Sequence, residues 1–152
     1  MFFRKKIKSN LLKYYIPAQI SGCLFGVMLA NVFFEHALLE LSTKNRDGLH
    51  IFFSEIIATF GLIFVIFATL KDGKTIVAIS VATYISAGYW FTSSTSFANP
   101  AVSIARTFTD SFTGINYLNT PTYILAEFIG LILAAYILKI ICLLYTSDAA
   151  DE

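Results

Sequence analysis

The sequence predicts an all-α integral membrane protein that combines complete transmembrane helices with one half-helix. Three observations indicate this fold class. Of the 152 residues, 57% are hydrophobic and 14% are charged, which is more apolar surface than a soluble domain of this size can bury. The apolar residues form four long stretches, separated by short polar segments. In addition, a polar run inside this apolar sequence leads into a helix that is too short to cross a bilayer.

The order of elements follows from where the charges fall. We expect a basic lead-in at residues 1–13, a transmembrane domain at residues 14–144 and a tail at residues 145–152. About 20 residues of helix cross a hydrocarbon core of about 30 Å. On that basis the complete spans are predicted at about residues 14–34, 51–70, 75–91 and 121–144.

The half-helix is predicted at residues 100–112. Asn99 is a favoured N-cap residue, and Pro100 fits the first helical position, where its missing N–H is no loss. The helix rises only about 20 Å, and non-helical backbone at membrane depth is tolerated only inside protein or beside water. We therefore predict a pore constriction at Asn99, Pro100 and Ala101. The alternative is an ordinary loop followed by an amphipathic helix.

The run Phe97-Ala98-Asn99-Pro100-Ala101 resembles the second Asn-Pro-Ala box of the aquaporin superfamily, the major intrinsic proteins. Together with the residues that follow it, the run is most similar to bacterial aquaporin-like channels associated with arsenic resistance. The resemblance covers roughly residues 14–138. It implies an aquaporin-like helical bundle and a passive channel for small uncharged solutes, namely water, glycerol-like polyols or neutral arsenic species. It also implies no enzymatic activity, no cofactor and a homotetramer when the protein is full length.

The same resemblance places a selectivity filter at Ala87, Ser96 and Val102. In most of the family an arginine directly follows the Asn-Pro-Ala box, and this sequence has Val102 there. Two small residues and one apolar residue predict a wide, weakly polar opening, although the sequence does not select one solute.

Two carboxylates, Glu55 and Glu127, lie inside predicted spans. A carboxylate at membrane depth is costly, so it must face the bundle interior, pair or be protonated. The family resemblance implies that Glu55 supports the backbone of the pore loop, and we interpret both glutamates as structural polar residues. The competing interpretation is a proton-coupled secondary transporter in which Glu55 or Glu127 carries the proton.

An internal repeat is present, because residues 15–22 and 123–130 both read Tyr-Ile-x-Ala-(Gln/Glu)-x-x-Gly. The two copies are three crossings apart, so they enter the membrane from opposite sides, as in an inverted-topology repeat. By that symmetry the first copy should also follow two spans and an Asn-Pro-Ala box. We therefore expect the chain to be a fragment covering the second half of a channel, and an inert fragment is a further alternative.

Charge indicates orientation and excludes some partners. The net charge of +1 indicates no nucleic-acid surface, and no residues have the spacing of metal ligands. Loops rich in Lys and Arg tend to lie on the cytoplasmic side of a membrane. Their distribution here predicts a cell-membrane protein with both termini inside. That orientation places eight basic residues in the cytoplasm: Arg4, Lys5, Lys6, Lys8, Lys13, Lys71, Lys74 and Lys139. It leaves three outside: Lys44, Arg46 and Arg106. The tail at residues 145–152 resembles translated sequencing-adaptor DNA, and we assign it no function.

Overall fold

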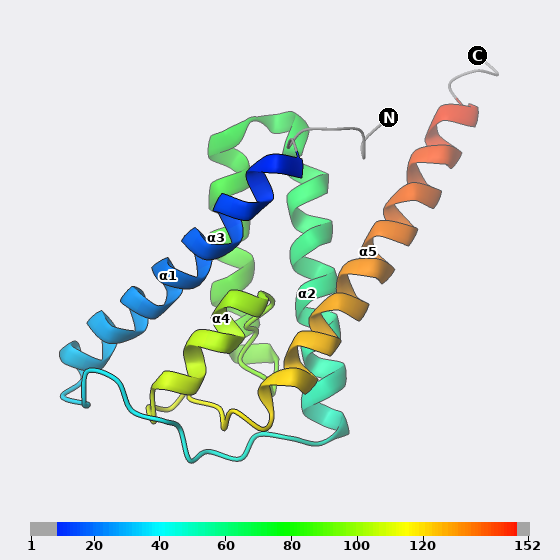
Figure 1. Ribbon diagram of the computed structural model, residues 1–152. Coiled ribbons are helices and arrows are strands. Elements are labelled where there is room, and N and C mark those ends of the chain that lie inside the picture. The colour runs from blue at the N-terminus through cyan, green and yellow to red at the C-terminus, as the bar shows by residue number, and fades with distance from the viewer. Residues whose placement is uncertain (1–8, 149–152) are drawn as a thin grey trace. The chain divides into compact units, whose positions relative to one another are not determined.

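The computed structural model describes residues 9–148, and in that part of the chain every regular element is a helix (Figure 1). The all-α membrane fold class is confirmed. The helices are α1 (Ser9–Phe33), α2 (Leu49–Thr69), η1 (Leu70–Asp72), α3 (Lys74–Phe91), α4 (Pro100–Ala105), η2 (Arg106–Phe108) and α5 (Thr120–Asp148). The first eight residues of the lead-in and the last four of the tail lie outside the described residues.

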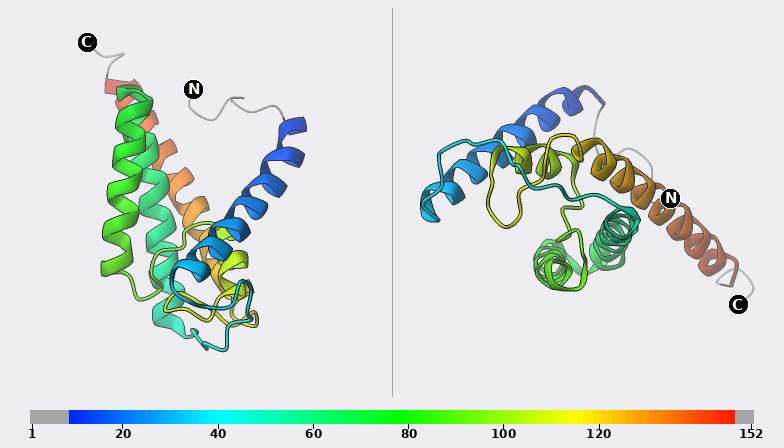
Figure 2. Two further views of the ribbon diagram at one scale, coloured as in Figure 1. Left: turned by 90° about the vertical axis from the view of Figure 1, so that its left-hand side faces the viewer. Right: turned by 90° about the horizontal axis from the view of Figure 1, so that it is seen from below.

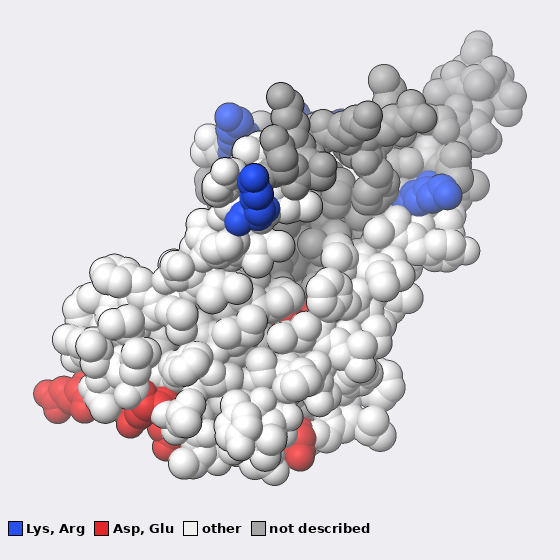
Figure 3. All heavy atoms as spheres, in the orientation of Figure 1, with Lys and Arg blue, Asp and Glu red and all other residues white. Residues whose placement is uncertain are grey.

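Three segments are long and apolar enough to cross a membrane by length and composition: Leu11–Phe33, Leu49–Asp72 and Thr120–Cys142. They correspond to three of the four predicted spans. α3 has 18 residues and rises about 27 Å, but it is less apolar, so the span at residues 75–91 stays a prediction. Uncharged side chains cover most of the visible face in Figure 3, as expected of a surface in contact with lipid.

The described residues form two compact units. The first contains residues 9–45 and 101–120. Asn31 of α1 organises it, because its Nδ2 donates to the carbonyl oxygens of Leu38 and Phe108, at 3.3 Å each, and its Oδ1 accepts from Thr109 Oγ1 at 2.6 Å. The backbone N–H of Ser42 also donates to the Thr107 carbonyl at 2.9 Å. The loop after α1 is thus bonded to the chain that follows α4.

The second unit contains residues 46–100 and 121–148. In it α2 and α3 lie side by side in the views of Figures 1 and 2, and Figure 1 shows that they run antiparallel. The Tyr84 hydroxyl of α3 donates to the Ala58 carbonyl of α2 at 3.0 Å. α5 approaches α2 closely at Gly130, where a Cβ atom would lie 2.5 Å from the Ile56 carbonyl oxygen. A side chain at residue 130 would therefore force these two helices apart.

The predicted boundaries hold at the start of the half-helix and fail at its end. α4 begins at Pro100 as predicted, but helical structure ends at Phe108 rather than at residue 112. Thr109 has extended backbone, with φ −146° and ψ 132°, and its hydroxyl is bonded to Asn31. This tertiary contact competes with another helical turn, so α4 and η2 together rise only about 15 Å.

The long helices also extend beyond two predicted boundaries. α1 begins at Ser9, inside the predicted lead-in, and α5 continues to Asp148, inside the predicted tail. A helix can project beyond the hydrocarbon core into the polar interface. The apolar stretches therefore did not mark the ends of α1 and α5, which reach Ser9 and Asp148.

Candidate functional site: a strained polar loop

Residues 92–99 connect α3 to α4, and we call this segment the polar loop. Most of its side chains are buried. Three residues of the polar loop, none of them glycine, have left-handed backbone: Thr95 (φ 64°), Ser96 (φ 51°) and Ala98 (φ 49°). This conformation is unfavourable for residues with a Cβ atom and persists where the surroundings enforce it, which is often at functional sites.

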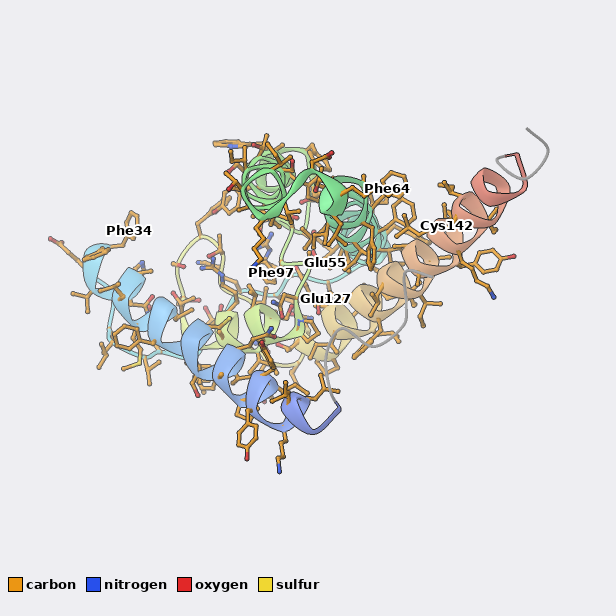
Figure 4. The ribbon with its side chains drawn as sticks, turned by 90° about the horizontal axis from the view of Figure 1, so that it is seen from above. Phe34, Glu55, Phe64, Phe97, Glu127 and Cys142 are labelled. Carbon is orange, nitrogen blue, oxygen red and sulfur yellow. The ribbon has the colours of Figure 1, made fainter. Side chains whose placement is uncertain are left out.

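Two buried carboxylates bind one side of the polar loop. Glu55 of α2 is 0% exposed and accepts hydrogen bonds from the backbone N–H groups of Phe97, at 3.4 Å, and of Ala98. Glu127 of α5 is 2% exposed and accepts from the Asn99 N–H at 3.1 Å. Figure 4 shows Glu55, Phe97 and Glu127 grouped together. Two helices thus bind three successive N–H groups just before α4 begins.

Arg46 binds the earlier part of the polar loop. Its Nη2 donates to the Ser93 carbonyl at 3.1 Å, and its Nη1 donates to Thr95 Oγ1 at 3.4 Å. The guanidinium carbon also lies 5.9 Å from the centre of the Phe97 ring. That ring stacks on Tyr123 of α5, with centroids 5.1 Å apart. The sequence placed Arg46 only among the basic residues outside the cytoplasm, because nothing near it in sequence indicates this contact.

The end of α3 supports the same loop. The Gly88 carbonyl accepts from Thr92 N, at 3.1 Å, and from Thr92 Oγ1, at 2.6 Å. A Cβ atom on Gly88 would lie 2.7 Å from Ser96 Oγ, so glycine is needed for Ser96 to sit against the helix. Ala87, the neighbouring residue predicted to line the filter, is exposed.

The remaining predicted site residues lie at the start of α4. Pro100 is its first residue, Ala101 is buried, and Val102 is half-buried. The structure therefore brings Asn99 together with Glu55 and Glu127, and Ser96 together with α3. The capping role of the Asn99 side chain and the filter roles of Ala87, Ser96 and Val102 stay predictions.

A second polar cluster, in the first unit, centres on Asp110. Its Oδ1 accepts from Thr43 N at 2.9 Å and from Ser42 Oγ at 3.2 Å, and its Oδ2 accepts from Thr43 Oγ1 at 3.2 Å. The hydrogen bond from the Thr43 N–H contributes most to holding the pKa of Asp110 below its usual 3.8, and the Lys44 charge adds to the effect. Asp110 therefore ties the loop after α1 to the chain after η2.

This cluster should make thermal stability depend on pH. The folded-state pKa of Asp110 is lowered, so its stabilising contribution is complete above pH 3.8 and disappears as the pH falls through the folded-state value. We expect Asp110→Asn to lower the melting temperature in detergent by a few degrees at neutral pH, and the difference from wild type to shrink in acid. Asp72→Asn, at an exposed site, is the control. A difference that stays constant down to the lowest pH would contradict the prediction.

Comparison with known proteins adds to this geometry. No family model and no solved structure matches the chain. Aquaglyceroporin AqpS of Rhizobium meliloti (strain 1021) is 41% identical over 125 residues, which are 82% of this chain and 54% of that protein. The chain thus spans about half the length of the curated relative that it matches. It is a multi-pass membrane protein, and by this similarity it belongs to the aquaporin superfamily.

Proposed function

We propose that the chain forms part of a passive channel for small uncharged solutes, and that the polar loop is the part that contacts the solute. The observation that carries the proposal is the binding of the Phe97 and Ala98 N–H groups to Glu55. In a trans peptide the carbonyl points opposite to the N–H. The carbonyl oxygens of Ser96 and Phe97 therefore point away from Glu55, where they would accept hydrogen bonds from a passing hydroxyl group.

Side-chain chemistry supports a solute larger than water. Among the described residues, the buried Ser96 hydroxyl has no hydrogen-bond partner, so it can bind a solute hydroxyl. Ala87 and Val102 add no polar group and little bulk. We infer a wide, weakly polar filter that admits glycerol-sized polyols or neutral arsenic species. The name of AqpS, an aquaglyceroporin, supports the polyols.

Topology and assembly belong to the same proposal. We infer four spans, both termini in the cytoplasm of a cell-membrane protein, and a homotetramer. An inverted repeat calls for a second half-helix that meets α4 at the midplane. The chain spans 54% of AqpS. We therefore assign the channel activity to the complete protein that contains these residues, and we call that protein the full-length channel.

The hydrogen bonds of the two glutamates argue against a proton-coupled transporter. A proton carrier must change its bonding in each cycle, and here such a change would release the Phe97, Ala98 or Asn99 N–H inside the protein. Such an unpaired group costs about 1–3 kcal/mol. Glycerol flux into liposomes that follows the glycerol gradient alone supports a channel, whereas flux driven by an imposed pH gradient supports the transporter.

Replacing Asn99 tests the channel directly. Asn99→Leu removes the predicted cap, worth about 1 kcal/mol, together with a polar side chain at the predicted constriction. We expect glycerol-driven swelling of liposomes containing the full-length channel to fall to nearly the level of empty vesicles. Asn45→Leu, at an exposed loop position, should conduct like the wild type. Wild-type flux through a normally expressed Asn99→Leu channel would mean that the polar loop does not line the pore.

A further inference from the structure

Arg46 contacts the polar loop at three points, and the sequence did not indicate these contacts. The guanidinium binds a carbonyl, a hydroxyl and an aromatic face, on Ser93, Thr95 and Phe97 respectively. All three lie within six residues of the predicted constriction at Asn99 to Ala101. A flexible surface arginine would not be expected to hold three such groups together.

The contacts of Arg46 complement those of the glutamates. Glu55 and Glu127 bind N–H groups at residues 97–99, after the left-handed Thr95 and Ser96. Arg46 binds oxygen atoms at residues 93 and 95, before and within the left-handed stretch. The strained backbone is thus held at both ends by groups of opposite charge. Strain of this kind persists only where the surroundings enforce it, so the loss of either end should change the loop.

The shape of the guanidinium matters as well as its charge. Its planar fork lets Nη1 and Nη2 bind two different residues while its central carbon lies over the Phe97 ring. Phe97 in turn stacks on Tyr123, so Arg46, Phe97 and Tyr123 form one column from the loop before α2 to α5. A lysine ammonium at residue 46 would keep the charge but not the fork or the stacking.

The charge itself has a second effect. Two buried carboxylates beside a solute path would attract cations, and Arg46 lies close enough to Glu55 for their charges to interact. We propose that Arg46 positions the polar loop and supplies the fixed positive charge that keeps cations out of the solute path. This inference rests on the proposed channel function.

The test measures two fluxes in liposomes containing the full-length channel: glycerol entry by swelling, and sodium entry with a sodium-sensitive dye. In Arg46→Gln we expect glycerol flux to fall about tenfold, because hydrogen bonds from a charged donor are lost, and sodium entry to rise above that of empty vesicles. In Arg46→Lys we expect glycerol flux to fall while sodium stays excluded. Lys44→Gln removes a positive charge two residues before Arg46, and it should change neither the glycerol flux nor the sodium flux.

The outcomes separate this inference from the proposed function. If the wild-type channel passes no glycerol, the proposed function fails. If the wild type conducts and Arg46→Gln keeps both wild-type glycerol flux and sodium exclusion, the role of Arg46 is wrong. Sodium entry through Arg46→Lys as large as through Arg46→Gln would overturn the charge argument. If Arg46→Gln does not fold, Arg46→Lys decides, because unchanged glycerol flux in that variant would refute the role of the guanidinium fork.

Discussion

Replacing Glu55 with alanine is expected to abolish solute flux through the full-length channel and to destabilise the protein. Glu55 is 0% exposed and accepts the Phe97 and Ala98 N–H groups. Its removal leaves two buried donors without their acceptor, at a cost of about 1–3 kcal/mol each. It also removes the constraint on the left-handed Ala98. Liposome swelling with glycerol and thermal unfolding in detergent measure the two effects.

The comparison with Glu55→Gln separates charge from hydrogen bonding. Glutamine keeps one acceptor oxygen but replaces the other with an NH₂ donor, which would face the N–H donors of the polar loop. We therefore expect Glu55→Gln to lose less stability than Glu55→Ala but still to lose most of the solute flux. Asp72→Ala, at an exposed acidic residue of η1, should leave both measurements unchanged. Wild-type flux in Glu55→Ala would show that the polar loop keeps its conformation without this carboxylate, and the proposed site would then be wrong.

Restoring an arginine directly after the Asn-Pro-Ala sequence is expected to separate large solutes from water. Val102→Arg would add a fixed charge and several donors on α4, at a half-buried position, and would narrow the predicted filter. We expect passage of glycerol-sized solutes to fall at least tenfold while water passage falls much less. Vesicle swelling in a glycerol gradient measures glycerol passage. The change in vesicle volume in a gradient of an impermeant osmolyte measures water passage.

A second substitution at the same residue distinguishes bulk from charge. Val102→Met adds length without a charge or a hydrogen-bond donor, so it should reduce glycerol passage by less than Val102→Arg. Equal loss of water and glycerol passage in Val102→Arg would mean that residue 102 does not set the width of the pore.

Local signals in the sequence were sufficient for much of the fold. Apolar length located the three membrane-crossing segments, and Asn99-Pro100 located the start of α4. The end of the half-helix was not predictable in this way. It depends on the bond between Thr109 and Asn31, which are 78 residues apart, and no pattern near Thr109 indicates that partner.

The candidate site likewise combines features that local sequence signals predicted with features that depend on distant contacts. The cost of a carboxylate at membrane depth identified Glu55 and Glu127 as residues that need partners, and the structure supplies partners in the polar loop. The left-handed backbone of Thr95 and Ala98 contradicts their local preferences, because neither residue is glycine or asparagine. Tertiary contacts impose that conformation. The contact of Arg46 with the loop was missed for the same reason.

The two glutamates that bind the polar loop also set an order for the synthesis of the protein. The ribosome delivers Glu55 before residues 92–99 and Glu127 after them. When the polar loop emerges, the partner of the Phe97 and Ala98 N–H groups is already present, but the partner of the Asn99 N–H is not. The polar loop can therefore reach its final conformation only after the part of α5 that carries Glu127 has been made and has entered the membrane.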